Sequence, residues 1–240
     1  MVYKSIRASL QRLFPPQCLL CLDHSGATTE ICPACRATLP WLGHHCRRCA
    51  LPLATANAKL CGRCLQRPPR FHQCLCALNY RFPVDSLLAD FKHHAKPPSG
   101  RLLAQLWLER CSAAAAAEPL PDALVPVPLH WRRRWQRGYN QSLLVSQYWG
   151  SALAIPVADL LRRQHATPPQ QGLTAAERRR NMKNAFHLAN PDRIRGKHLA
   201  LVDDVLTTGT TANAAAAILL RAGATRVDVW CLARTPAPGQ

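Results

Sequence analysis

The pattern of apolar and polar positions separates a long C-terminal segment with regular elements from an N-terminal segment without them. Alternating apolar positions predict a strand at 74–80, and short apolar runs predict buried parallel strands at 122–129, 197–204 and 226–233. Helical spacing predicts helices over 86–94, 101–117 and 138–154, and a further helix between the last two strands. This alternation predicts an α/β fold with a parallel sheet and helices on both faces.

The first 70 residues contain too few large apolar side chains to fold alone. We therefore predict a small domain at 1–70 and an α/β domain at 71–240. The spacing of apolar residues over 1–14 predicts a short basic helix with these residues along one side. We interpret this helix as a cap packed on the next domain, and contact with a membrane surface is the alternative.

Cysteine spacing explains how the small domain folds. Eight cysteines form four CxxC pairs, namely Cys18 with Cys21, Cys32 with Cys35, Cys46 with Cys49, and Cys61 with Cys64. Two such turns surround one tetrahedral zinc ion, so we predict a double zinc ribbon with two structural Zn²⁺ ions. Sequential pairing of the turns is the simplest arrangement, and an interleaved pairing satisfies the same count. The apolar surroundings of four other cysteines predict burial, namely Cys74, Cys76, Cys111 and Cys231.

The charge balance adds a polyanion to the expected partners. The 240 residues include 31 Lys and Arg against 13 Asp and Glu, for a formal net charge of +18. Residues 1–80 contain ten basic and two acidic residues, and residues 130–200 contain thirteen and three. Such surfaces favour phosphate groups, either of a nucleic acid or of a small ligand.

Neither a transmembrane segment nor a secretory signal is evident. No apolar run approaches the ~20 residues that span a bilayer, and the N-terminus lacks the apolar region of a signal peptide. We therefore expect a cytoplasmic protein, with peripheral binding at the inner membrane face as the alternative. In that compartment a metal explains the CxxC pairs better than disulfides do.

The candidate ligand site follows the predicted strand at 197–204. Asp203 and Asp204 end this strand, where ligands of parallel α/β sheets bind. The turn Thr207–Thr211 then offers backbone N–H groups, hydroxyls and a helix N-terminus to a phosphate. The acids suit sugar hydroxyls or a metal ion. A Walker A loop is excluded because no GK[ST] follows the glycine.

The stretch LVDDVLTTGTT at 201–211 resembles the phosphoribosyl-pyrophosphate (PRPP) motif of type I phosphoribosyltransferases. The resemblance implies that this sheet has the fold of that family, and that PRPP binds together with Mg²⁺. It also implies that Asp203 and Asp204 bind the ribose hydroxyls. The 5′-phosphate is then held by the residues of the turn, namely Thr207, Thr208, Gly209, Thr210 and Thr211.

Other segments extend the resemblance to essentially the whole chain. VPVPLHWRRRWQRGYNQS at 125–142, QQGLTAAERRRNMKNAF at 170–186 and the cysteine-rich N-terminus are similar to the ComF/GntX group of competence-type proteins. In that group a zinc ribbon precedes a phosphoribosyltransferase domain, and the group is associated with uptake of external DNA or its use as a nutrient. The net charge favours single-stranded DNA as a partner, and the association with DNA uptake adds the DNA-import machinery. Five aromatic residues are candidates to stack on bases, although helical spacing favours the core for most of them, namely Trp131, Trp135, Tyr139, Tyr148 and Trp149.

Three arginines are candidates for further phosphate contacts. By analogy with phosphoribosyltransferases, Arg133 and Arg137 lie where a loop holds pyrophosphate, and Arg179 lies where a mobile hood covers the site. Bidentate guanidinium contacts suit phosphate oxygens. A solvated surface, or a surface that contacts a DNA backbone, explains the same arginines equally well.

We predict an accessory protein of DNA uptake or utilisation that binds PRPP and single-stranded DNA. The alternative is an active phosphoribosyltransferase that acts on a nucleobase or a related acceptor. A purely structural adaptor is a third interpretation, in which the acid pair has no role. No residue identifies an acceptor or a catalytic nucleophile, so the catalytic residues remain unassigned.

Overall fold

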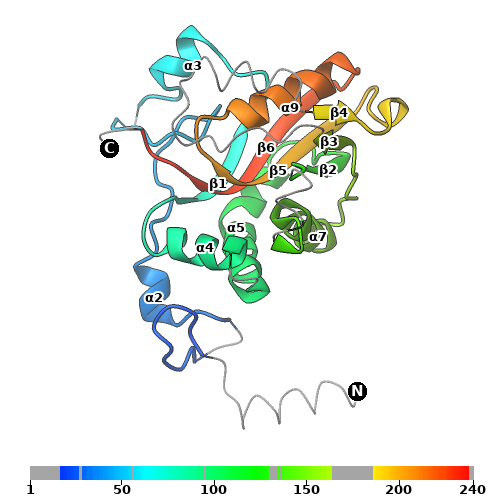
Figure 1. Ribbon diagram of the computed structural model, residues 1–240. Coiled ribbons are helices and arrows are strands. Elements are labelled where there is room, and N and C mark those ends of the chain that lie inside the picture. The colour runs from blue at the N-terminus through cyan, green and yellow to red at the C-terminus, as the bar shows by residue number, and fades with distance from the viewer. Residues whose placement is uncertain are drawn as a thin grey trace.

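A four-stranded parallel sheet forms the centre of the molecule (Figure 1). The computed structural model describes residues 17–26, 29–55, 57–93, 96–129, 135, 137–163 and 186–237. The sheet has the order β1-β6-β5-β2, with β1 at Cys74–Asn79, β2 at Ala123–Pro126, β5 at His198–Leu206 and β6 at Arg226–Arg234. All three strand pairs are parallel. The predicted α/β fold and its strands are confirmed.

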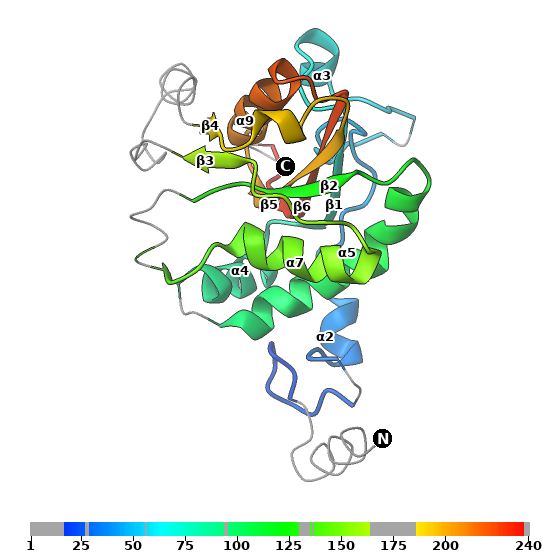
Figure 2. The ribbon, with the colours of Figure 1, turned by 90° about the vertical axis from the view of Figure 1, so that its right-hand side faces the viewer.

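Helices cover both faces of this sheet (Figure 2). One face packs against α4 (Val84–His93), α5 (Pro97–Ala116) and α7 (Gln141–Leu153), and the other packs against α9 (Thr210–Arg221). Consecutive side chains of a strand point to opposite faces, so the almost wholly buried β6 supplies apolar residues to both layers. A short two-stranded antiparallel sheet, β3 (Leu161–Arg163) with β4 (Phe186–Leu188), and the 3₁₀ turn η1 (Pro191–Arg193) complete the described α/β part.

Three tryptophans form the centre of the layer that contains α4, α5 and α7. Trp107, Trp149 and Trp230 are at most 1% exposed, and the ring centroid of Trp107 lies 4.2 Å from that of Trp149 and 4.9 Å from that of Trp230. The indole N–H of Trp149 donates to the Ala104 carbonyl at 3.0 Å. Trp149 is therefore a core residue and is not available to stack on a nucleobase.

The two cysteine-rich ribbons pack on different parts of the α/β fold. The first contains α2 (Pro33–Ala37) and lies beside α4 and α5, where Arg36 pairs with Glu109 at 2.7 Å (Figure 1). The second contains α3 (Gly62–Gln66) and lies on the side of α9. The segment between them runs antiparallel to β1 at Trp41 and Leu78. The domain boundary at residue 70 stays a prediction.

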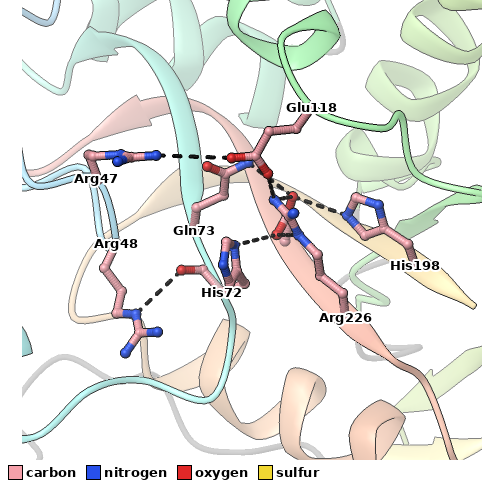
Figure 3. A network of polar contacts seen from close by, with 8 residues as sticks. Arg47, Arg48, His72, Gln73, Glu118, His198 and Arg226 are labelled. Atoms are coloured by element: carbon pink, nitrogen blue, oxygen red, sulfur yellow. Dashed lines mark hydrogen bonds and ion pairs between the residues drawn. The ribbon is translucent and has the colours of Figure 1, made fainter.

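A polar network joins the second ribbon to the edge of the sheet at which β1, β5 and β6 begin (Figure 3). Its centre is Asp228, 3% exposed, which accepts two hydrogen bonds from Arg226 at 2.9 and 3.0 Å and contacts His198 at 3.1 Å. Burial by itself would raise the pKa of Asp228. The hydrogen bonds from His198 and Arg226 lower it by more, so the pKa lies below its usual value. Arg47 and Arg48 of the CRRC turn contact Glu118 and the His72 carbonyl. The buried Asp228 carboxylate therefore has hydrogen-bond partners for both oxygens and stabilises the contact between neighbouring elements.

Candidate functional site

A pocket of about 240 Å³ lies at the edge where β5 ends, opposite the polar network of Asp228. The two predicted acids, Asp203 and Asp204, line it together with Thr207 and Thr211. The remaining predicted residues, Thr208, Gly209 and Thr210, form the turn between these two threonines. The structure thus brings together the whole LVDDVLTTGTT segment at the edge of a parallel sheet where ligands of such folds bind.

The acid pair is held in a defined arrangement by its neighbours. Asp203 Oδ1 accepts from the Asp204 backbone N–H at 2.9 Å and from the Ser142 hydroxyl at 3.5 Å. Asp204 Oδ2 lies 2.9 Å from Lys92 Nζ. Burial raises the pKa of Asp203 to about 7, and the charge of Asp204 adds to the shift. Near neutral pH the pair can both accept and donate hydrogen bonds, which suits ribose hydroxyls.

The threonine turn combines a left-handed glycine with a helix N-terminus. Gly209 has φ +74° and is the N-cap of α9, a conformation that other residues rarely adopt. The Thr208 hydroxyl lies 2.8 Å from the Thr210 hydroxyl and accepts from the Thr210 backbone N–H at 3.4 Å. The first N–H groups and the positive end of the helix dipole favour a phosphate at this place.

Three cationic side chains line the same pocket, namely Lys92, Arg137 and Arg163. Arg137 was predicted, and its Nη1 donates to Gln141 Oε1 at 3.4 Å. The guanidinium carbon of Arg163 in β3 lies 5.7 Å from the centroid of the Phe186 ring in β4. Arg133 and Arg179 lie outside the described residues. Lys92 and Arg163 were missed because no local pattern sets them apart from other surface cations.

The RGYNQS segment positions the start of α7 against the pocket. Gly138 has φ +76°, and Asn140 caps the helix by accepting from the Ser142 N–H at 3.1 Å. The Asn140 amide also donates to the Val127 carbonyl at 3.2 Å, which ties the loop after β2 to the helix. Gln141 and Ser142 are thereby fixed in the pocket wall.

A buried arginine that sequence reasoning missed connects the threonine turn to the second ribbon. Arg234, 5% exposed, ends β6 and donates to the carbonyls of Leu206 at 2.9 Å and Thr207 at 2.7 Å. Its Nε donates to the Cys49 carbonyl at 2.8 Å. The same guanidinium therefore holds the start of the threonine turn and a CxxC turn of the second ribbon.

The eight CxxC cysteines gather into two clusters. Cys18, Cys21, Cys32 and Cys35 form one, and Cys46, Cys49, Cys61 and Cys64 form the other, with all sulfurs of a cluster within 4.8 Å of one another. This confirms the sequential pairing and excludes the interleaved one. The Sγ atoms of Cys21 and Cys32 lie 3.8 Å apart, and those of Cys49 and Cys61 lie 3.7 Å apart. Tetrahedral zinc with bonds of ~2.3 Å requires a separation of about 3.8 Å, so zinc fits both clusters.

Backbone N–H groups in the first cluster favour the thiolate form of Cys18. Although burial raises the pKa of Cys18, hydrogen bonds from backbone N–H groups lower it to about 6. The Leu20 N–H donates to this sulfur at 3.5 Å, and the Cys35 N–H donates to Cys32 Sγ at 3.4 Å. The four other cysteines, Cys74, Cys76, Cys111 and Cys231, are buried as predicted.

The remaining sequence predictions have mixed outcomes. Of the aromatic residues that could stack on bases, Trp135 is 85% exposed, whereas Tyr139 packs among the helices, where its hydroxyl donates to the Phe91 carbonyl. Trp131 and the predicted helix at 1–14 lie outside the part of the chain that the structure describes. No helix within the described ranges is both long and apolar enough to cross a bilayer.

Two protein-family models match this chain, one in its N-terminal part and one in its C-terminal part. A double zinc ribbon domain matches residues 9–65, and a phosphoribosyl transferase domain matches residues 144–239. Lys92 lies outside both matches.

Curated relatives match almost the entire chain. "DNA utilization protein YhgH" of Salmonella typhi is 39% identical over 232 residues, which cover 92% of this chain and 98% of that protein. The protein of the same name from Escherichia coli strain K12 is 38% identical over 229 residues, with coverages of 92% and 98%. "Competence protein F" of Haemophilus influenzae is 34% identical over 233 residues, with coverages of 94% and 100%.

Among solved structures, adenine phosphoribosyltransferase from Leishmania tarentolae matches part of this chain. It is 16% identical, has a TM-score of 0.39, and the match covers 66% of this chain and 75% of that chain.

Proposed function

Because this chain belongs to the family of ComF/YhgH-like proteins, in which a double zinc ribbon precedes a phosphoribosyltransferase domain, we propose that it acts in DNA utilisation as a PRPP-binding protein. We further propose that single-stranded DNA binds to its second zinc ribbon. A PRPP-dependent transferase is the second candidate, since the acid pair and the cations share one pocket.

The observation that carries the PRPP proposal is the charge pattern of the pocket. The pocket is lined by Thr207 and Thr211 at the two ends of the threonine turn, by the acids Asp203 and Asp204, and by three cations. PRPP carries a 5-phosphate, two ribose hydroxyls and a diphosphate, so it matches anion, hydroxyl and anion sites in one molecule. Magnesium bound with PRPP would offset part of the diphosphate charge.

A basic surface on the second ribbon supports the DNA proposal. The 54 residues from 31 to 84 contain no Asp or Glu. We use the name ribbon cation surface for Lys59, Arg63, Arg67 and Arg70, which are exposed and have no acidic partner among the residues that the structure describes. The Arg70 N–H donates to Asn213 Oδ1 of α9 at 2.6 Å, so this surface begins close to the threonine turn. Exposed cations of this kind contact phosphates of a nucleic acid backbone.

Calorimetric titration of the zinc-loaded protein with PRPP and Mg²⁺ tests the main proposal. We expect saturable binding, and a short single-stranded oligonucleotide tests whether the two sites are coupled. A parallel assay measures pyrophosphate release. Binding without release supports the DNA-utilisation protein, whereas release that depends on an added base or nucleic acid identifies a transferase. A protein that binds no PRPP under these conditions contradicts both candidates.

Removal of three charges from the ribbon cation surface is expected to weaken DNA binding. For the R63Q/R67Q/R70Q variant we expect the affinity for a single-stranded oligonucleotide to fall by about ten- to a hundredfold at low salt. The slope of log affinity against log salt should become shallower by about 2, because each phosphate contact in single strands contributes about 0.7. Fluorescence anisotropy at several salt concentrations measures both quantities.

A matched variant separates contact from net charge. Arg36, Arg101 and Arg162 each pair with a carboxylate, of Glu109, Glu30 and Asp159 respectively. The R36Q/R101Q/R162Q variant removes the same charge and should change the affinity much less. Equal losses in the two triple variants would show a general charge effect and reject the ribbon cation surface as the binding site.

A further inference from the structure

Lys92 reaches the candidate PRPP pocket from a helix that is distant in sequence from the PRPP motif. It lies in the last turn of α4, and its Nζ is 2.9 Å from Asp204 Oδ2. The Lys92 and Asp204 side chains are only 19% and 17% exposed. Water therefore screens this ion pair less than a pair on the open surface, and the ammonium group is held at one place.

The structure of ribose indicates which part of the ligand would lie next to the Lys92 ammonium group. If Asp204 binds a ribose hydroxyl, as in the proposed function, a cation beside Asp204 lies close to the ring carbons that carry the hydroxyls. Carbon C2 carries one of these hydroxyls and is bonded to C1. The 5-phosphate lies at the other end of the sugar, toward the threonine turn. If Asp204 binds the hydroxyl on C2, Lys92 lies within reach of the group on C1.

We propose that Lys92 binds the diphosphate on C1 of PRPP and so distinguishes PRPP from ribose phosphates without a charged group on C1. This inference rests on the proposed function of the pocket. A lysine ammonium has three N–H donors, and one contact to Asp204 leaves two for phosphate oxygens. Arg137 and Arg163 line the same pocket and add positive charge around it. Asp204 orients Lys92, and Lys92 connects the hydroxyl site to the diphosphate site.

A purely structural ion pair would behave differently. If Lys92 only stabilised Asp204, its removal would weaken every ligand that uses the acid pair to the same extent. If Lys92 contacts the diphosphate, its removal weakens PRPP and spares ribose 5-phosphate, which shares the hydroxyls and the 5-phosphate. The ratio of the two affinities therefore separates the roles.

The experiment compares PRPP with ribose 5-phosphate by calorimetry, with Mg²⁺ present, on the full zinc-loaded chain. For K92M we expect the PRPP affinity to fall by about ten- to a hundredfold, the range for a lost charge-assisted hydrogen bond. The ribose 5-phosphate affinity should stay within about threefold of wild type. K92R retains a positive charge and N–H donors for phosphate oxygens, so it should recover most of the PRPP affinity.

K96M is the matched control. Lys96 also pairs with an aspartate, Asp90 at 3.0 Å, but lies outside the pocket, so its replacement should change neither affinity. Thermal unfolding of each variant checks the fold. Equal losses for both ligands in a folded K92M protein, or no loss for PRPP, would overturn the role of Lys92. A wild-type protein that binds neither ligand would instead overturn the proposed function and this inference with it.

Discussion

Replacing both Asp203 and Asp204 with asparagine is expected to lower PRPP affinity at least a hundredfold. Above pH 7, where Asp203 is ionised, each carboxylate that accepts a hydrogen bond from a ribose hydroxyl contributes about 1.5–3 kcal/mol, and every 1.4 kcal/mol corresponds to tenfold in affinity. Two such bonds, if independent, account for the predicted loss. Calorimetry with PRPP and Mg²⁺ measures it, and an unchanged affinity would reject the assignment of the acid pair.

The same substitution should leave the fold intact. An asparagine Oδ1 can still accept from the backbone N–H of residue 204 and from the Ser142 hydroxyl, as Asp203 does.

The stability of the wild-type protein is expected to depend on pH through Asp203, whose pKa rises from 3.8 to about 7 on folding. The folded state therefore binds more protons between these values, and stability conferred by the neutral form is lost as the pH rises toward 7. Replacing Asp203 with asparagine removes this dependence, so melting above pH 7 should occur at or above the wild-type temperature. D192N, at an exposed acid of η1, is the control.

Loss of zinc is expected to unfold both ribbons. Binding of structural zinc contributes about 10–16 kcal/mol in zinc-finger peptides, far more than the few apolar contacts of a ribbon provide. Chelation should change the circular dichroism spectrum and open protease sites in the first 70 residues, while the sheet retains its own core. An unaltered spectrum and protease pattern in chelator would contradict a structural role for the metal.

The two zinc sites are expected to differ in their effect on PRPP. The C61S/C64S variant disrupts the second ribbon, whose Cys49 carbonyl accepts from Arg234, and the same arginine holds the Thr207 carbonyl. We therefore expect roughly a tenfold loss of PRPP affinity, as for one or two weakened hydrogen bonds. The C32S/C35S variant disrupts the first ribbon, which packs beside α4 and α5 but contributes no residue to the pocket, and should lower PRPP affinity less. Equal effects of the two variants would reject the path through Arg234.

Features that depend on neighbours in sequence were predictable from the sequence. The LVDDVLTTGTT segment, the strands and the CxxC turns each contain their signal within about a dozen residues. In these segments the backbone conformation follows from local chemistry, such as the glycine at the left-handed position of the threonine turn. The small sheet of β3 and β4 was missed because its strands have only three residues each, too few for an alternation to be visible.

The sequence by itself thus determined the α/β class, the two metal-binding ribbons and the position of the LVDDVLTTGTT segment. Only the tertiary structure decided which cysteines share an ion, and that Lys92 and Arg163 join the acid pair in one pocket. It also placed Arg234 between the threonine turn and the second ribbon. These contacts arise when helices and strands pack through apolar faces, and the packing fixes the distance between polar groups that no sequence spacing encodes.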